Sequence, residues 1–327
     1  MFDWLIHRAR ALRTWLFVRL RIWRGRWRRG SVRVAGTHFM HRLPWHLPWR
    51  HGGSAWRYGL YVPGGLPDDQ SAPLVVVLHG CKQRALGFAY AAGWTDFADA
   101  ARVRLLCPDQ RRRANLYRCW NWFHPLAQGG HGELAVINAM IDDVSGRVKV
   151  DARAIAAIGI SAGGALAALL AFHCASRFRA VATVAAPPLL GHYNVQNPHG
   201  VMQRGVALDP LLALGARLGP CAPLAIIHGA ADEVVHPRCA DQLQAQAVEA
   251  FRRGGRALAP GSPAASAAGV SVTDFRADGE LLVRRIEVAG LGHEWTGGPG
   301  GHAYCEPQGA PLTAWCAQFL RDVGALG

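Results

Sequence analysis

Long uncharged runs are missing from the N-terminal part of this 327-residue sequence. Within residues 1–30 the longest stretch without a charged side chain is residues 14–18. A secretory signal needs roughly 7–15 apolar residues and a transmembrane helix about 20. We therefore expect neither a conventional signal peptide nor a membrane span. This favours a cytoplasmic or surface-associated protein and leaves secretion as the alternative.

Metal-binding patterns are also missing. The cysteines show no CxxC pair and no Cys/His spacing of the kind that holds a structural metal, so the sequence predicts no metal site. Their even number permits disulfide bonds, and with them an oxidising compartment, without requiring either. The eight cysteines are Cys81, Cys107, Cys119, Cys174, Cys221, Cys239, Cys305 and Cys316.

Acidic residues are scarce at the N-terminus. Residues 1–60 hold thirteen arginines and a single acid, Asp3, so they carry +12 of the net charge of +14. The rest of the chain is therefore close to neutral. Apolar side chains in the first part of this segment fall on one helical stripe, with arginines turned away from it. The stripe consists of Leu5, Ala9, Leu12, Leu16, Leu20, Trp23 and Trp27.

A basic amphipathic helix of this kind suits an anionic membrane or the surface of an apolar polymer granule. We expect residues 1–30 to bind such a surface; an unstructured extension and a helix packed on its own domain are the alternatives. Nucleic acid is not favoured as a partner, because no recognisable nucleic-acid-binding fold accompanies the charge. Prolines and a glycine pair in residues 30–55 indicate a linker. We predict an extension over residues 1–52 and a folded domain over residues 53–327.

The pentapeptide GISAG at residues 159–163 lies between two apolar segments. Residues 154–160 are typical of a buried strand and residues 163–175 of a helix. Strand, G-x-S-x-G and helix are the context of a nucleophile elbow, a strained turn that presents a serine hydroxyl at the edge of a sheet. The pattern predicts that Ser161 is a nucleophile. A serine in an ordinary strand–helix turn is the alternative.

Strand-like and helix-like segments alternate along the folded domain, which predicts a doubly wound, mostly parallel α/β sheet flanked by helices. Residues 187–219 are typical of an excursion that roofs a site, and residues 254–269 of a mobile loop. The predicted strands are residues 56–62, 74–79, 103–107, 154–160, 181–185 and 224–228, with two more around a turn at residues 277–279; the predicted helices are residues 85–101, 133–148, 163–175, 238–253 and 310–323.

An acid and a histidine follow later strands at the same edge of the sheet. Asp232 comes after residues 224–228, and His293 after the last predicted strand. The order Ser161, Asp232, His293 is that of the α/β-hydrolases, in which the acid orients the imidazole and the imidazole deprotonates the serine. We predict this fold and this triad. Helix capping is the other interpretation of Asp232, and the rival residues are Asp209, Glu233 and Asp241 for the acid and His236 and His302 for the base.

From about residue 56 to residue 320 the chain resembles the polyhydroxybutyrate depolymerase-type esterases, which are related to feruloyl and acetylxylan esterases. The resemblance implies an esterase that uses Ser161, Asp232 and His293. Ala230 departs from the family pattern, and no separate polymer-binding domain is expected, so soluble oligomers, amorphous granules or small esters are the expected substrates. The motifs are residues 58–63 (YGLYVP), 78–81 (LHGC), 119–123 (CWNWF), 159–164 (GISAGG), 228–237 (HGAADEVVHP) and 290–298 (GLGHEWTGG).

Two backbone N–H groups are predicted to form the oxyanion hole. In hydrolases of this architecture one belongs to the loop after an early strand and the other to the residue after the nucleophile. These groups are the N–H of Cys81 and the N–H of Ala162. A catalytic thiol and a plain turn cysteine are the alternatives for Cys81.

The aromatic cluster at residues 119–123 follows a strand at the edge where ligand sites gather. It is expected to line the pocket, with ordinary core packing as the alternative. The predicted substrate-binding residues are Trp120, Asn121, Trp122 and Trp295. Because Cys81 and Cys119 both border the proposed site, we also predict that they lie close enough to form a disulfide.

These inferences combine into a serine esterase that needs no cofactor and hydrolyses 3-hydroxybutyrate oligomers or polyhydroxyalkanoate through an acyl-enzyme. A feruloyl, acetylxylan or general short-chain carboxylesterase is the first alternative. A surface-binding protein with an incidental hydrolase body is the second.

Overall fold

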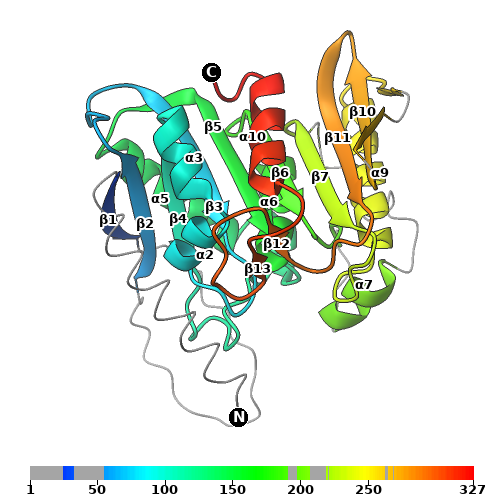
Figure 1. Cartoon of the computed structure of the whole chain (residues 1–327), viewed down its shortest axis with the longest axis horizontal. Coiled ribbons are helices and arrows are strands. Elements are labelled where there is room, and N and C mark those ends of the chain that lie inside the picture. The colour runs from blue at the N-terminus through cyan, green and yellow to red at the C-terminus, as the bar shows by residue number, and fades with distance from the viewer. Residues whose placement is uncertain are drawn as a thin grey trace.

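Buried parallel strands form the centre of the fold, as the continuous apolar runs predict. The computed structural model describes residues 25–32, 55–190, 197–206, 219, 221–261, 264–267 and 269–327. The main sheet has the strand order β1-β2-β4-β3-β5-β6-β7-β11-β10-β8, with β9 paired to β10. From β4 to β11 neighbouring strands run parallel, and the pairs at both ends are antiparallel (Figure 1). This confirms the predicted doubly wound, mostly parallel sheet.

The boundaries of most elements lie within a few residues of the predicted ones. The strands are β1 (Gly25–Val32), β2 (Trp56–Pro63), β3 (Ala72–Leu78), β4 (Arg104–Asp109), β5 (Val150–Ile160), β6 (Ala180–Val184), β7 (Leu224–Gly229), β8 (Ala259–Pro260), β9 (Ala264–Ala267), β10 (Val270–Ala277), β11 (Glu280–Val288), β12 (Trp295–Thr296) and β13 (Cys305–Glu306). The helices are α2 (Ala85–Ala91), α3 (Trp94–Ala101), α4 (Pro125–Gln128), α5 (Glu133–Ser145), α6 (Ala162–His173), α7 (Pro198–Arg204), α9 (Arg238–Arg253) and α10 (Leu312–Asp322).

Two segments differ from their predicted form. The single helix predicted over residues 85–101 is divided into α2 and α3 by Gly93, whose φ of 82° cannot belong to a right-handed helix. The predicted loop at residues 254–269 contains β8 and β9, which add backbone pairs to the exposed edge of β10. Sheet edges recruit such short strands because their unpaired N–H and C=O groups need partners.

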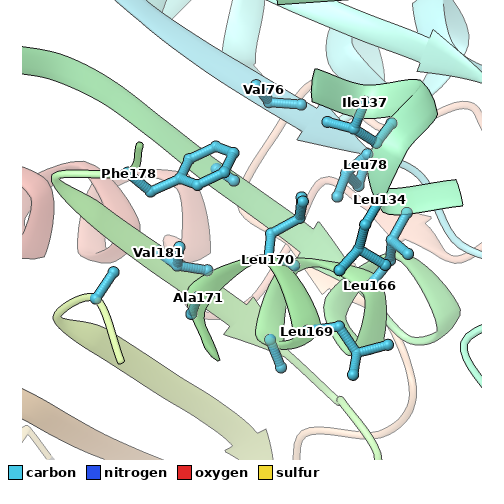
Figure 2. Packing of buried hydrophobic residues seen from close by; sticks show 14 of the residues in the cluster. Val76, Leu78, Leu134, Ile137, Leu166, Leu169, Leu170, Ala171, Phe178 and Val181 are labelled. Carbon is cyan, nitrogen blue, oxygen red and sulfur yellow. The ribbon is translucent and has the colours of Figure 1, made fainter. Parts of the chain in front are cut away.

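Helices cover both faces of the sheet and create two apolar layers. One layer holds buried residues of α5, α6 and α9, and the other those of α2, α3 and α10. Figure 2 shows the first layer, where Leu166 and Leu170 of α6 pack beside Leu134 of α5, near Val76 and Leu78 of β3. Because α6 is buried along almost its whole length, its first turn is held rigidly beneath the carboxyl edge of the sheet.

Part of the basic N-terminal segment, residues 25–32, forms the edge strand β1 of the main sheet. β1 pairs antiparallel with β2, the Trp27 ring lies 5.0 Å from the Tyr61 ring, and Arg28 forms an ion pair with Asp68. The prediction that the helical stripe extends to Trp27 is therefore wrong at that end. Residues 25–32 form a strand because the edge of β2 offers unpaired backbone N–H and C=O groups as partners. Residues 1–24 and the predicted linker up to residue 54, apart from residues 25–32, lie outside the described residues.

Candidate active site

The GISAG turn has the strained geometry of a nucleophile elbow. Ser161 joins β5 to α6 with φ 56° and ψ −124°, and its N–H donates to the Val184 carbonyl at 2.9 Å. A Cβ at Gly159 would lie 2.3 Å from the Gly163 carbonyl oxygen, and one at Gly163 would lie 2.3 Å from the Leu78 carbonyl oxygen. Only glycine fits at these two positions. The turn leaves Ser161 8% exposed at the start of α6, where the helix dipole favours a negative charge.

A continuous chain of hydrogen bonds joins the three predicted side chains. His293 Nε2 lies 2.9 Å from Ser161 Oγ, and His293 Nδ1 lies 2.8 Å from Asp232 Oδ2. Because an ionised carboxylate only accepts, the proton of the neutral imidazole belongs on Nδ1. Nε2 is then free to accept the Ser161 proton, which is the arrangement that makes a serine nucleophilic.

Asp232 is fixed by the turn that follows β7. Its Oδ1 accepts the N–H groups of Val234 at 2.9 Å and Val235 at 2.8 Å, and its Oδ2 lies 3.5 Å from His228 Nε2. Burial raises the pKa of Asp232, but the hydrogen bond from His293 and the backbone donors outweigh it and keep the pKa below its ordinary value. The carboxylate is therefore ionised when it faces the imidazole.

The rival residues take other roles. Asp241, on α9, forms an ion pair with Arg285 of β11, and His302 lies against Gly87 of α2. His236 Nδ1 accepts the N–H of Arg238, at the start of α9. None of them contacts Ser161 within the described part of the chain, where Glu233 contributes its carbonyl to Gln203. Asp209 lies outside the described residues.

The two predicted oxyanion donors have no hydrogen-bond partner among the described residues. Among the described residues no hydrogen bond uses the N–H of Cys81, although its neighbours are tied: Gly80 N–H donates to Gln83 and Lys82 N–H to the Tyr117 carbonyl. The N–H of Ala162, in the first turn of α6, also has no partner there. Two free N–H groups flanking a nucleophile are what a tetrahedral oxyanion needs.

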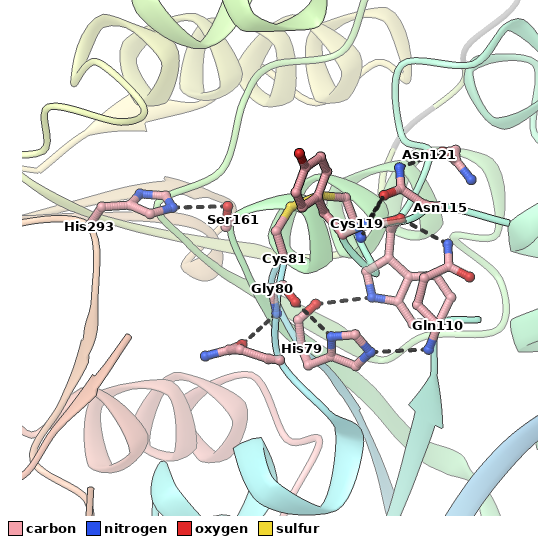
Figure 3. The surroundings of a disulfide bond; sticks show 12 residues. His79, Gly80, Cys81, Gln110, Asn115, Cys119, Asn121, Ser161 and His293 are labelled. Atoms are coloured by element: carbon pink, nitrogen blue, oxygen red, sulfur yellow. Dashed lines mark hydrogen bonds between the residues drawn. A yellow bond between two sulfur atoms is a disulfide. The ribbon is translucent and has the colours of Figure 1, made fainter. Parts of the chain in front are cut away.

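A disulfide holds the Cys81 loop to the aromatic loop. Cys81 and Cys119 are bonded, with their Cα atoms 4.2 Å apart, which confirms the predicted pairing. Figure 3 shows the bond beside Ser161, with His293 on the opposite side of the serine. The serine thus lies between an acid–base side and a cross-linked side that carries an oxyanion donor.

A family model described as esterase PHB depolymerase matches residues 56–270. The chain belongs to that family. Poly(3-hydroxyalkanoate) depolymerase C of Paucimonas lemoignei is 29% identical over 281 residues, which cover 81% of this chain and 66% of that protein. The putative esterase NocK of Nocardia uniformis subsp. tsuyamanensis is 30% identical over 74% of this chain and 71% of its own length. The chain therefore spans about two thirds of the depolymerase.

Solved structures agree on the fold of this family member. Acetyl xylan esterase from Aspergillus awamori superposes with a TM-score of 0.65 at 16% identity, covering 91% of this chain and 99% of that one. A ferulic acid esterase superposes with a TM-score of 0.55 at 14% identity, covering 93% and 100%. These similarities show the α/β-hydrolase fold, as predicted.

The aromatic loop of this PHB depolymerase-family chain, residues 119–123, is packed largely in the protein interior. Trp120 is fully buried and donates its indole N–H to the His79 carbonyl at 3.0 Å. Asn121 and Trp122 are buried as well, and Asn121 is bonded to Glu133. These side chains offer almost no surface to a ligand in this structure, and their contact with substrate stays a prediction. They support the loop that carries Cys119.

Trp295 is also buried, although it lies two residues from His293. Its indole N–H donates to Thr313 Oγ1 at 3.0 Å, and its ring meets Phe88 edge-on at 5.4 Å. Its predicted contact with substrate likewise stays a prediction. The tryptophan instead packs β12 against α2 and α10, below the loop that presents the histidine.

Three exposed apolar side chains that the sequence analysis missed, here called the apolar rim, are those of Tyr117, Val234 and Tyr304. Tyr117 is 62% exposed, and its carbonyl accepts the N–H of Lys82, the residue after Cys81. The Tyr304 ring meets the His293 ring edge-on, with the ring centres 6.0 Å apart. Val234 lies in the turn of the acid. Their position was the only signal that the sequence offered. Tyr117 lies two residues from Cys119, Val234 two residues from Asp232, and Tyr304 two residues from His302. The other exposed large apolar residues in the described ranges are Leu116 and Leu126.

Neither a metal centre nor a membrane helix is found in the residues that can be described. No three His, Cys, Asp or Glu side chains gather there in a way that would hold a metal ion. No helix in the same ranges has both the length and the hydropathy to cross a bilayer.

Proposed function

We propose that this chain is a serine esterase that hydrolyses 3-hydroxyalkanoate esters, with 3-hydroxybutyrate oligomers or polyhydroxyalkanoate as substrate. The observation that carries the proposal is the hydrogen-bond chain from Asp232 through His293 to Ser161, next to two free N–H groups. Membership of the esterase PHB depolymerase family and the similarity to the Paucimonas lemoignei depolymerase support the choice of acyl group.

The geometry supports a two-step reaction. Ser161 Oγ bonds to the ester carbonyl carbon while its proton moves to His293 Nε2, and the N–H groups of Cys81 and Ala162 hold the oxyanion. As the tetrahedral adduct collapses, the C–O bond to the leaving alcohol breaks and His293 returns the proton to that oxygen. Water then attacks the acyl-enzyme, gives its proton to His293, and the hydroxy acid leaves as Ser161 is reprotonated.

The apolar rim supports an apolar acyl chain. Tyr117 and Val234 expose their side chains on the loops that carry Cys119 and Asp232, and Tyr304 exposes its side chain beside His293. A chain of hydroxybutyrate units, with one methyl group and one ester per unit, can bury its apolar parts against such a rim at about 25 cal/mol per Å².

A feruloyl ester is the second candidate, because Tyr117 and Tyr304 offer exposed rings against which a feruloyl ring would stack. Feruloyl esterase B of Neurospora crassa is 26% identical over 64% of this chain. The test is the initial rate of the parent protein and of Ser161→Ala on 3-hydroxybutyrate trimer, methyl ferulate and acetylated xylan. A preference of at least tenfold in kcat/KM for the trimer supports the first candidate, a preference for ferulate supports the second, and turnover that survives in Ser161→Ala contradicts both.

Surface attachment remains a separate proposal for the residues that precede β1. Residues 1–24 hold six arginines and one aspartate among leucines and tryptophans. We infer that they bring the enzyme to an anionic membrane or a polyester granule and take no part in the chemistry.

A further inference from the structure

The orientation of the Cys81 N–H is set at the other end of its own peptide group. The Gly80 carbonyl oxygen and the Cys81 N–H belong to one planar trans peptide and point in opposite directions. His79 Nδ1 lies 2.7 Å from the Gly80 oxygen (Figure 3). A group that fixes this carbonyl therefore also fixes the direction in which the N–H points.

His79 is able to do this because its tautomer is fixed. The backbone N–H of Gln110 points at His79 Nε2 from 3.1 Å, so Nε2 must accept and the proton must lie on Nδ1, facing the Gly80 oxygen. Burial lowers the pKa of His79 to about 4, so the ring is neutral at the neutral pH at which a serine esterase works. His79 is fully buried and does not reach Ser161.

Gln110 is in turn held by Glu133, the first residue of α5. Gln110 Nε2 donates to Glu133 Oε1 at 2.5 Å and to the Cys119 carbonyl at 3.0 Å. Glu133 also accepts the backbone N–H of Asn121 at 2.7 Å and its side-chain amide at 2.9 Å. One buried carboxylate thus holds both Gln110, which follows β4, and Asn121 of the aromatic loop, and Cys119 of that loop is bonded to Cys81 through the disulfide.

We propose that Glu133 is a positioning residue for the oxyanion hole, acting through Gln110 and His79 on the Cys81 peptide. The proposal rests on the proposed esterase function, since it assigns the Cys81 N–H to the oxyanion. Glu133 is fully buried and touches neither Ser161 nor His293, so it acts on the reaction only through the groups that it holds. An oxyanion donor stabilises the transition state only when its direction is already set.

The decisive variant is Glu133→Gln, which keeps the size of the side chain and replaces an acceptor with an amide that faces two amide donors. A donor removed outright costs about 10²–10³-fold in kcat, so a misdirected one is expected to cost about 10-fold to 100-fold, with KM unchanged. Affinity for a trifluoromethyl ketone should fall by the same factor, because its Ser161 adduct places an oxyanion in the hole. Gln110→Met breaks the same contact from the other side and should behave alike.

Arg104→Met is the matched control. Arg104 is fully buried at the start of β4, the strand that Gln110 follows, and it donates to the carbonyls of Lys149, Pro67 and Gln70. Its loss should lower the melting temperature and leave kcat and the ketone affinity unchanged. If Glu133→Gln and Gln110→Met also lose only thermal stability, the proposal is overturned. If the parent protein itself fails to hydrolyse esters and to bind the ketone, the proposed function fails instead.

Discussion

The two sides of Ser161 are built differently. On the oxyanion side a disulfide and buried hydrogen bonds hold the Cys81 peptide from both ends. On the acid–base side Asp232 is fixed by backbone donors, whereas His293 is held by that carboxylate and by the edge of the Tyr304 ring. The difference follows the reaction, because an oxyanion donor works best when it stays still and an imidazole must carry a proton from one oxygen to another.

The buried carboxylates on the two sides show the same contrast. Burial raises the pKa of Glu133 to about 7, against the hydrogen bonds from the amides of Gln110 and Asn121 that lower it. Burial also opposes the charge of Asp232, but there the bond to His293 outweighs it, and the pKa is lowered. A carboxylate that must stabilise an imidazolium is thus kept ionised, while one that only holds a loop is left near its titration point.

The largest expected effect breaks the acid–base side. Ser161→Ala and His293→Ala should each lower kcat on a soluble chromogenic ester by about 10⁶-fold, and the double variant should be no worse than either, because the members of a triad act as a unit. Far-UV circular dichroism should be unchanged, since neither truncation removes a backbone hydrogen bond. His302→Ala is the control; if it abolishes turnover and His293→Ala does not, the assignment of the base is wrong.

The next effect loosens the oxyanion side. Replacing Cys81 and Cys119 together by alanine keeps the Cys81 N–H but opens a cross-link that spans 38 residues. Chain-entropy arithmetic for a loop of that length gives a loss of about 3–4 kcal/mol in the free energy of unfolding, measured in urea. We expect kcat to fall about tenfold with KM unchanged. Cys174→Ser, which alters a free cysteine at the C-terminal end of α6, should leave kcat intact; an unchanged kcat in the double variant would show that the hydrogen bonds alone suffice.

The sequence was most informative about the acid–base side. A glycine two residues either side of Ser161 is required by contacts of 2.3 Å, so the motif reports backbone geometry directly. Asp232 and His293 could be selected because each follows a strand of a parallel sheet, and carboxyl ends of such strands meet at one edge. Hence pattern and spacing sufficed to predict which three side chains come together.

Side-chain burial in loops could not be predicted in this way. Four residues near the site, chosen for aromatic or polar character, prove to be buried. Two of them, Trp120 and Trp295, donate their indole N–H groups to partners inside the protein.

The role of Glu133 could not be predicted from the sequence for a related reason. A glutamate at the start of a helix is explained in any sequence by its favourable interaction with the helix dipole. Only the fold shows that three N–H donors converge on Glu133. Likewise, an apolar stripe flanked by arginines fitted a helix as far as Trp27, and only the pairing of β1 with β2 shows that Trp27 lies in a strand.

A smaller effect sharpens the contrast between the two carboxylates. Because the folded-state pKa of Glu133 is raised, the folded protein binds more protons than the unfolded chain between about pH 4.5 and 7. The free energy of unfolding of the parent should therefore fall relative to Glu133→Gln by about 2 kcal/mol as the pH rises from 5 to 8. For Asp232→Asn the sign reverses, since the parent loses stability relative to this variant as the pH falls towards 3. Urea titrations at each pH measure both, and a difference that is flat with pH contradicts the assignment.

The smallest expected effect on chemistry comes from the N-terminus, where two deletions separate attachment from folding. Removing residues 1–24 leaves β1 in place, so kcat on a soluble ester should stay within twofold of the parent. Binding to anionic vesicles or polyester particles should weaken. The binding of the parent protein to vesicles should also weaken as salt is added, because exposed charges are screened over about 8–10 Å.

Removing residues 1–32 also takes away β1 and the Arg28–Asp68 ion pair, exposing the edge of β2. This longer deletion should lower the free energy of unfolding by roughly 1–2 kcal/mol and, with it, the melting temperature by several degrees. Vesicle sedimentation and thermal unfolding distinguish the two, and a loss of soluble-ester turnover in the shorter deletion would show that residues 1–24 belong to the fold.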